Sequence, residues 1–181
     1  SIFFKNLLVI IWFETSKPNV WILFEEYLKF LRFISKQKIC AFGKYFANHI
    51  VKNFKPKKII IFSRDEEKQR LMKDNLSKKT IETFRFFLGD VRDRDRVNMA
   101  FNGVDYVIHA AALKHVPTAE YNPFECIQTN VHGAENLINA ALRQNVKRVI
   151  ALSTDKAVAP INLYGASKLA AEKIFVAGNN L

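Results

Sequence analysis

The sequence has little glycine, proline or cysteine. Its 181 residues include six glycines, five prolines and two cysteines, whereas hydrophobic residues make up 49% of the chain. Scarce glycine and proline beside abundant hydrophobic residues argue against a disordered or collagen-like chain. The length suffices for one α/β domain with a buried core and little more.

The two cysteines, Cys40 and Cys126, lie far apart, and neither belongs to a C-x-x-C pair. This spacing argues against a zinc site, and we predict no bound metal. Two reduced thiols are the usual state in a reducing compartment, so we expect a cytoplasmic protein.

Long apolar runs are also lacking. A membrane helix needs about 18 to 20 successive apolar residues, and the uncharged stretches NLLVIIWF and PNVWILF near the start are much shorter. No small-residue cleavage site follows them, so they do not indicate a secretory signal. We therefore predict no membrane span.

Basic residues outnumber acidic ones by 28 to 17, which gives a net charge of +11. Residues 1–88 hold 18 Lys and Arg against 8 Asp and Glu, and residues 89–181 hold 10 against 9. A basic half is compatible with nucleic-acid binding. Because no helix carries a stripe of basic residues interleaved with aromatics, we expect a solvated surface that suits phosphate-bearing ligands, and no nucleic-acid partner.

Residues 1–40 differ from the rest of the chain. They are rich in Phe, Ile, Leu and Lys and contain no glycine. Apolar residues at helical spacing predict an amphipathic helix over Trp21–Phe33. Because no functional motif lies in this stretch, we treat it as an atypical segment of unclear status and expect one domain over residues 41–181.

From residue 42 onward, short β-branched apolar runs alternate with longer helical patterns. This alternation predicts βαβ units and a doubly wound parallel sheet, an α/β fold in which ligands bind outside the carboxyl ends of the strands. The predicted strands are Lys58–Phe62, Thr83–Leu88, Asp105–Ala111 and Arg148–Leu152, and the predicted helices are Phe42–Phe54, Asp65–Leu76, Arg92–Phe101, Pro123–Asn145 and Asn162–Ala177.

Tyr164 and Lys168 form a Y-x-x-x-K pattern in the last predicted helix. Residues four apart lie on one helix face. A nearby ammonium would lower the pKa of the phenol, so that Tyr164 exchanges a proton with a substrate hydroxyl while Lys168 binds a cofactor ribose. The pattern alone is common on helix surfaces, and its place shortly after a predicted strand is what indicates a site.

That strand ends in Ser153-Thr154-Asp155-Lys156, where an acid and a base are adjacent. A solvated turn with Asp155 as a helix cap is the ordinary interpretation of such a segment. Beside the Y-x-x-x-K pattern we favour the functional interpretation, in which Asp155 and Lys156 are catalytic.

Two further motifs follow strands. Asp90-Val91 comes after the strand FRFFL, where an Asp would hold an adenine amino group with the Val packed on the ring; a plain turn is equally compatible. Ser63-Arg64-Asp65 follows KIIIF, where an acid binds the ribose 2′-hydroxyl of NAD and an Arg accommodates the 2′-phosphate of NADP. Arg64 with Ser63 favours NADP, and Asp65 leaves NAD as the alternative.

Small residues stand at the end of the predicted strand Asp105–Ala111 and directly after it. Ala110, Ala111 and Ala112 would let a cofactor lie close to the sheet. Lys114 and His115 would then face the substrate.

Five segments together resemble the polysaccharide-biosynthesis branch of the extended short-chain dehydrogenases, and within it the nucleotide-sugar 4,6-dehydratases. The resemblance covers about residues 42–181. The segments are Gly89–Asp93, Val107–Pro117, Ala119–Asn136, Ala151–Ala157 and Ile161–Phe175.

This resemblance implies a Rossmann-like fold that uses NADP to remove water from UDP-N-acetylglucosamine, in the synthesis of surface polysaccharide or flagellin glycans. As hydride passes from C4 to the cofactor, Tyr164 would remove the 4-hydroxyl proton. Lys156 would then abstract the C5 proton, Asp155 would protonate the departing 6-hydroxyl, and hydride would return to C6.

The resemblance also implies further contacts. Gly43, Lys114, Ser153 and Tyr164 join the expected cofactor-binding residues, and Lys114, His115, Asn130 and Thr154 are the expected substrate-binding residues. A UDP-sugar is the expected partner, and a homo-oligomer is the expected assembly.

The sequence departs from the family pattern at both ends. The family opens with a glycine loop of the type GGTGSFG, whereas the aligned stretch here is Gln37–Gly43, in which only Phe42 and Gly43 agree. The family continues past the position of Leu181 into a smaller substrate domain. We therefore expect an incomplete Rossmann-like sheet without that domain, as in a fragment of a longer gene whose frame is disrupted near residue 41.

Two alternatives stay open at this point. The same fold serves related nucleotide-sugar epimerases and reductases. The missing glycines also allow a non-catalytic remnant, such as a basic binding protein, so the sequence leaves open whether this copy binds cofactor and is active.

Overall fold

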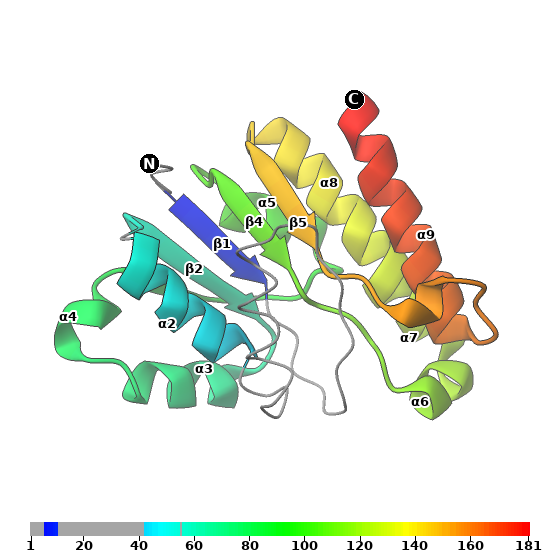
Figure 1. The fold of residues 1–181 in the computed structure, drawn as a ribbon, viewed down its shortest axis with the longest axis horizontal. Helices are drawn as coiled ribbons and strands as arrows, with labels where there is room; N and C mark the ends of the chain where they lie inside the picture. Colours follow the sequence, from blue (N-terminus) through cyan, green and yellow to red (C-terminus); the bar gives the residue numbers. More distant parts are fainter. Residues whose placement is uncertain (1–5, 11–41, 55) are drawn as a thin grey trace.

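The computed structural model describes residues 6–10, 42–54 and 56–181, with the backbone alone for residues 6–10 and 42–45. Among these residues, five parallel strands form one sheet in the order β3-β2-β1-β4-β5 (Figure 1). The doubly wound fold predicted from the sequence is confirmed. The predicted helix Trp21–Phe33 lies outside the described residues. The strands are β1 (Asn6–Ile10), β2 (Lys58–Ser63), β3 (Phe84–Leu88), β4 (Tyr106–His109) and β5 (Arg148–Ala151).

The central strand of the sheet is β1, which the sequence analysis did not assign. It pairs in parallel with β2 on one side, where Leu8 lies opposite Ile60, and with β4 on the other, where Leu8 lies opposite Val107. From β1 the chain therefore adds β2 and β3 on one side of the sheet and then crosses back to add β4 and β5 on the other side. In doubly wound sheets ligands bind at this reversal, outside the carboxyl ends of the strands.

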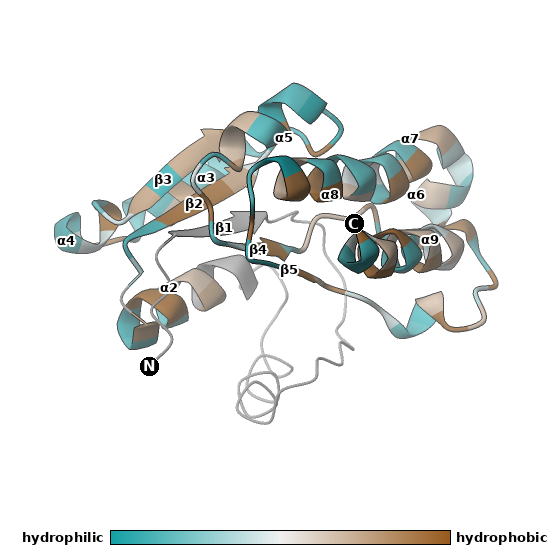
Figure 2. Cartoon of the chain, turned by 90° about the horizontal axis from the view of Figure 1, so that it is seen from above, coloured by the Kyte–Doolittle hydropathy of each residue, from teal (hydrophilic) through white to brown (hydrophobic). Residues whose placement is uncertain are grey.

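Helices cover both faces of the sheet (Figure 2). On one face α2 (Phe42–Phe54) packs Phe46 and Ile50 against Ile59 and Ile61 of β2. On the other face, helices α5 (Arg94–Ala100) and α8 (Gly133–Arg143) pack against Phe62 of β2 and neighbouring residues. Alternate residues of β2 thus enter opposite cores, as expected for a strand buried on both faces.

Side chains of the sequence fix several helix starts. Asp65 caps α3 (Glu66–Asp74), Asp93 caps α5 and Asn162 caps α9 (Leu163–Ala177), each accepting a backbone N–H of the first turn. The helices predicted from residues 65, 92 and 162 therefore begin one or two residues later. A short helix that the sequence analysis did not predict, α4 (Lys78–Ile81), follows α3.

The predicted long helix Pro123–Asn145 is composite. It consists of α7 (Pro123–Ile127), a π-helical turn η2 (Gln128–His132) and α8. A further short helix, α6 (Val116–Tyr121), lies in the loop after β4. π-Helical turns within α-helices often mark functional sites.

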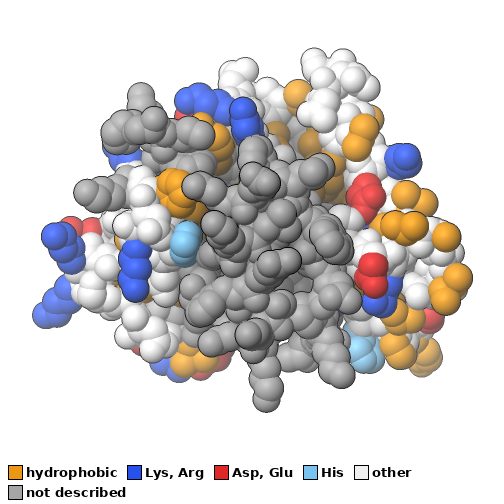
Figure 3. Space-filling model, in the orientation of Figure 1, with side chains coloured by type: hydrophobic (Ala, Val, Ile, Leu, Met, Phe, Trp, Pro, Cys, Tyr) orange, Lys and Arg blue, Asp and Glu red, His pale blue; other side chains and the backbone are white. Residues whose placement is uncertain are grey.

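Apolar side chains are exposed at the end of the molecule that holds the carboxyl ends of β4 and β5. Tyr121 and Phe124 of α6 and α7 and Val158 and Ile161 of the loop before α9 are the most exposed of them. Figure 3 shows hydrophobic side chains gathered along one side of the molecule. Within the described ranges, no helix is long and apolar enough to cross a membrane.

Candidate functional site

Most residues predicted to form the site lie at the carboxyl ends of the strands (Figure 1). Ser63 ends β2, Asp90 follows β3, Ala110 follows β4 and Ser153 follows β5. Gly43 lies in the first turn of α2. Parallel strands bring these loops to one edge of the sheet.

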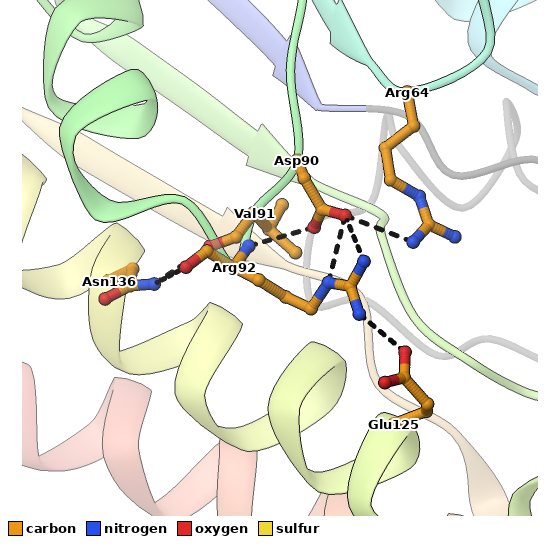
Figure 4. A network of polar contacts seen from close by, with 6 residues as sticks. All are labelled: Arg64, Asp90, Val91, Arg92, Glu125 and Asn136. Carbon is orange, nitrogen blue, oxygen red and sulfur yellow. Dashed lines mark hydrogen bonds and ion pairs between the residues drawn. The ribbon is translucent and has the colours of Figure 1, made fainter. Parts of the chain in front are cut away.

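Asp90 is the centre of an ionic network (Figure 4). Its Oδ2 accepts hydrogen bonds from Arg64 Nη1 at 3.1 Å and Arg92 Nε at 2.9 Å. Burial raises the pKa of Asp90, but the hydrogen bonds from Arg92 and Arg64 outweigh it and hold that pKa below its ordinary value. Val91, beside it, is 3% exposed and packs in the core. The predicted adenine site thus keeps an ionised carboxylate at Asp90, whereas the side chain of Val91 packs in the core and leaves little surface for an adenine ring.

The three residues predicted to choose the cofactor face different ways. Arg64 points to Asp90, whereas Asp65 accepts the backbone N–H of Lys68 at 2.9 Å and pairs with its ammonium at 2.8 Å. The hydrogen bond with Lys68 lowers the pKa of Asp65. Ser63 is buried, and Gln69 Nε2 donates to its hydroxyl at 3.0 Å. Because Ser63 Oγ accepts from Gln69, its own proton is left to donate.

The loop after β4 divides between core and surface. Ala111 is 2% exposed and packs in the core, while Ala110 and Ala112 are half-buried. Lys114 is half-buried, and His115 is exposed with its Nδ1 2.7 Å from the hydroxyl of Thr118. Ala110, Ala112 and the two basic residues therefore remain accessible to a ligand.

Asn130, predicted to contact substrate, is buried in the π-helical turn. Its Oδ1 accepts the N–H of Leu113 at 2.7 Å, and its Nδ2 donates to the Leu113 carbonyl at 2.9 Å and to Ser167 Oγ at 2.9 Å. With the side chain 2% exposed and its amide satisfied internally, Asn130 fastens the β4 loop to α9. In this structure its side chain reaches no ligand-accessible space.

The acid and base of the segment after β5 lie together on a 3₁₀ turn, η3 (Asp155–Ala157), capped by Thr154. Asp155 Oδ1 accepts from the Thr154 hydroxyl at 3.0 Å and lies 3.5 Å from Lys156 Nζ. The hydrogen bond with Thr154 lowers the pKa of Asp155. Both side chains are about half exposed, at 56% and 50%, so this pair faces solvent as ions.

Tyr164 and Lys168 are both buried, at 8% and 6% exposed. Burial lowers the pKa of Lys168 to about 8, although Glu172 opposes this shift, and Lys168 Nζ donates to the Leu152 carbonyl at 2.7 Å. Burial raises the pKa of Tyr164. The expected lowering of the phenol pKa by Lys168 is therefore wrong, because burial dominates and the ammonium is hydrogen-bonded to Leu152.

A close backbone contact joins the turn η3 to α9. A Cβ atom at Gly165 would collide with the carbonyl oxygen of Lys156 and lie 2.9 Å from Cβ of Pro160. The glycine therefore lets the helix with Tyr164 and Lys168 pack directly against the turn with Asp155 and Lys156. The four predicted catalytic residues thus lie on two elements in contact.

A cleft of about 890 Å³ runs along the outer edge of β5, between α8 and α9. Ser153, Lys168 and Glu172 line one part of it. Ser153 also hydrogen-bonds Glu172 through its hydroxyl. Lys168, the predicted ribose-binding residue, thus borders this cleft.

His109, at the end of β4, is a buried titratable residue that sequence reasoning left without a role. Its ring lies 5.5 Å from that of Phe175, and its Nδ1 has no hydrogen-bond partner among the described residues. Burial, with the nearby charge of Lys168, lowers its pKa to about 3. His109 is therefore a neutral ring beneath Lys168.

Three positioning residues were missed from the sequence. Gln69 holds Ser63, Arg92 holds Asp90, and Glu172 holds Ser153. Only Glu172 had a local signal, since it lies four residues after Lys168 on the same helix face. Arg92 lies two residues after Asp90 and Gln69 six residues after Ser63, and neither spacing by itself indicates a side-chain hydrogen bond.

Comparisons with known proteins agree with this architecture. An inverting UDP-N-acetylglucosamine 4,6-dehydratase from Campylobacter jejuni is 56% identical over 141 residues, which are 78% of this chain and 41% of the relative. A UDP-glucose 4-epimerase from Rickettsia canadensis is 53% identical over 121 residues, 67% of this chain and 35% of the relative. The chain thus spans well under half the length of these curated relatives.

Solved structures share the fold. The X-ray structure of Pen from Bacillus thuringiensis superposes with a TM-score of 0.79 at 34% identity, covering 99% of this chain and 48% of that one. The dTDP-glucose 4,6-dehydratase DesIV from Streptomyces venezuelae, solved with NAD and TYD bound, superposes with a TM-score of 0.68 at 20% identity, covering 94% of this chain and 50% of that one. At that identity, DesIV supports the fold alone.

The sequence profile of one family matches residues 40–181, which is most of the chain. This match includes the loops after β2, β3, β4 and β5 and the helix with Tyr164 and Lys168. It confirms the resemblance found in the sequence: the chain belongs to the polysaccharide biosynthesis protein family.

Proposed function

We propose that this chain provides the cofactor-binding and proton-transfer residues of a nucleotide-sugar 4,6-dehydratase that acts on UDP-N-acetylglucosamine with NADP. The observation that carries the proposal is the adjacent Asp155 and Lys156 on a turn packed against the helix of Tyr164 and Lys168. The 56% identity to a relative of that name supports the substrate class. A cytoplasmic location, suggested by two cysteines that lie far apart in the sequence, is part of the proposal.

The donor set at the ends of β2 and β3 fits a 2′-phosphorylated adenosine. Arg64 offers a guanidinium suited to a phosphate, and the Ser63 hydroxyl has a proton to donate. Asp90 offers a carboxylate to an adenine amine. Asp65, the residue that would favour NAD, is occupied as the cap of α3, which supports NADP. Residues 37–41, where the sequence analysis places the diphosphate loop, lie outside the described residues.

A bound nicotinamide would supply reversible acceptance of a hydride, and this chain would move the protons. Asp155 and Lys156 form an ion pair, with 3.5 Å between Lys156 Nζ and Asp155 Oδ1. Transfer of one proton from Lys156 Nζ to Asp155 gives a neutral pair with the same total of protons. Bound sugar that excludes water would favour this neutral pair, because desolvation penalises ions.

The neutral pair has the two functions that dehydration needs. Lys156 takes the proton from C5, and Asp155 gives its proton to the departing 6-oxygen, which leaves as water and restores the ion pair. Tyr164 exchanges a proton with the 4-hydroxyl. Lys168 donates to the cofactor ribose in place of the Leu152 carbonyl.

The test is product analysis of the purified chain incubated with UDP-N-acetylglucosamine and NADP. We expect a 4-keto-6-deoxy sugar nucleotide, detected by mass spectrometry as the loss of one water. Lys156→Met and Asp155→Asn should each abolish this product. Lys173→Met, which changes an exposed lysine on the same helix as Tyr164, should leave it unchanged.

A chimaera extends the test beyond the ends of this chain. In it, residues 42–181 replace the matching segment of the Campylobacter jejuni dehydratase. Dehydration by the chimaera and its loss in the Lys156→Met chimaera are the expected results. A folded chimaera that binds the sugar but removes no water would refute the proposal.

An epimerase is the second candidate, because relatives named UDP-glucose 4-epimerase are about as similar to this chain as the dehydratase. Epimerisation leaves the mass of the sugar nucleotide unchanged. A product of unchanged mass and altered C4 configuration would therefore favour the epimerase.

A further inference from the structure

Asp90 is clamped by one residue from two sides. Its Oδ1 accepts the backbone N–H of Arg92 at 3.0 Å, and its Oδ2 accepts Arg92 Nε at 2.9 Å and Nη2 at 2.8 Å. Arg64 Nη1 approaches the same Oδ2 at 3.1 Å (Figure 4). Two guanidinium groups therefore share one carboxylate oxygen, and Oδ1 accepts one hydrogen bond from the described residues.

Arg92 is held in place by groups other than Asp90. Its Nη1 lies 2.5 Å from Glu125 Oε2 of α7, and Asn136 Nδ2 of α8 donates to the carbonyls of Val91 and Arg92 at 3.0 and 3.2 Å. The hydrogen bond with Asp90 raises the pKa of Arg92, which therefore stays charged.

The charges alternate along the network as Arg64, Asp90, Arg92 and Glu125, and their sum is zero. Without Arg92, the network would carry one net negative charge, and within it the carboxylate of Asp90 would be balanced by Arg64 alone. It would then attract the Arg64 guanidinium more strongly and repel a phosphate that binds there. Arg64 and Asp90 are only partly exposed, at 38% and 20%, so solvent screens this effect incompletely.

We propose that Arg92 is a specificity-determining residue that lets Arg64 bind a 2′-phosphate by neutralising Asp90, while leaving Asp90 Oδ1 to an adenine amine. The inference rests on the proposed function, because it places a 2′-phosphorylated adenosine at this end of the sheet. Arg92 acts through Asp90 and Arg64 and needs no contact with the phosphate.

The experiment compares two small probes that differ by one group, adenosine 2′,5′-bisphosphate and adenosine 5′-monophosphate. Their affinities for the chain are measured by isothermal titration calorimetry, which needs neither sugar substrate nor turnover. Wild-type protein should prefer the bisphosphate. Arg92→Gln should weaken the bisphosphate about tenfold, the order of one charge-assisted hydrogen bond, and the monophosphate much less.

Glu125→Gln is the matched variant, because it removes the opposite charge from the same chain of contacts. Without the Glu125 carboxylate, more of the positive charge of Arg92 acts on Asp90 and on the bound phosphate, so the preference for the bisphosphate should stay or increase. If Arg92 only supported the fold, both substitutions would weaken both probes alike. Arg92→Lys keeps the charge and should retain part of the preference; with Glu125→Gln it carries the test should Arg92→Gln fail to fold.

Three results would overturn the inference. They are a wild-type chain without preference for the bisphosphate, an Arg92→Gln variant with unchanged preference, and a Glu125→Gln variant that loses as much preference as Arg92→Gln. Product analysis tests the proposed function separately. A chain that dehydrates the sugar but shows no such preference fails the inference alone, and one with the preference but no product fails the function alone.

Discussion

Lys168 is an ammonium at a buried position, with its pKa lowered from 10.5 to about 8. Between these two values the unfolded chain binds the proton and the folded chain does not. The unfolded state therefore holds more protons in this range, and the stability of the fold rises as the pH rises from about 8 towards 10.5. Below this range the cost of burying the charge is fully present.

Lys168→Met should remove this dependence. At 1.36 kcal/mol per pKa unit, wild-type protein should gain on the order of 3 kcal/mol of unfolding free energy relative to the variant between about pH 8 and pH 10.5. Urea unfolding of both proteins at several pH values measures the difference. Lys173→Met, at an exposed position of the same helix, should show no such gain, and a flat difference for Lys168→Met would contradict the lowered pKa.

At the level of residues, the sequence predicted where side chains lie in the fold better than it predicted their pKa values and hydrogen-bond partners. The Y-x-x-x-K spacing predicted that Tyr164 and Lys168 share a helix, and they do. It did not predict that burial raises the pKa of Tyr164 or that Lys168 turns to the Leu152 carbonyl. Burial and hydrogen-bond partners depend on tertiary packing, which spacing along one helix does not contain.

Among the elements, the contact between η3 and α9 depends on the absence of a side chain at Gly165. In Gly165→Ala the new Cβ meets the backbone oxygen of Lys156 and the ring of Pro160, neither of which can yield as a flexible side chain would. We expect a loss of about 1–3 kcal/mol in unfolding free energy. The dehydration rate of the protein that remains folded should also fall, because Asp155 and Lys156 move with the turn.

Gly178→Ala is the control for this prediction. Its Cβ would lie 3.1 Å from methyl groups of Ile138, an apolar side chain that can adjust, so the cost should be below about 1 kcal/mol. Chemical unfolding and product formation are measured for both variants. Equal effects of the two substitutions would show that the contact at Lys156 does not position the turn.

The order of strands and helices from residue 42 onward was largely predictable, whereas the π-helical turn within one helix and a short helix within one loop were not. Helix α2 has the predicted bounds, and the four predicted strands all occur. The π-helical turn within Pro123–Asn145 was missed because its residues continue a helical pattern, and Asn130, which lies in it, bonds to Leu113 and Ser167 far along the chain. Helix α6 was also not predicted, because it is only six residues long and lies in the loop after β4, where the sequence was interpreted as binding motifs.

At the scale of the whole molecule, the strand β1 lies at the centre of the sheet but outside the segment that matches the family. The family match begins at residue 40, yet residues 6–10 pair with both β2 and β4 in the middle of the sheet. Sequence reasoning left this stretch unassigned because a short apolar run does not distinguish strand from helix by periodicity. The expected glycine loop, which would have marked it as the first strand, does not follow it in the sequence.

Leu8→Pro tests whether the fold of the whole chain depends on this strand. Proline lacks a backbone N–H and is not accommodated in the middle of a sheet. Because β1 joins β2 and β4, the two halves of the sheet would lose their connection. We expect a loss of about 3 kcal/mol or more, a large share of the roughly 5–15 kcal/mol that holds a domain together. Far-UV circular dichroism and urea unfolding report this loss, while Leu8→Val, which keeps the N–H and favours extended backbone, should unfold almost as wild-type protein does.

If Leu8→Pro unfolds with unchanged midpoint and cooperativity, β2 and β4 do not need residues 6–10 between them. The site would then rest on residues 42–181 alone. If it unfolds as expected, the loops that carry Arg64 and Asp90 on one side and Tyr164 and Lys168 on the other are held in one site by a strand outside the family match.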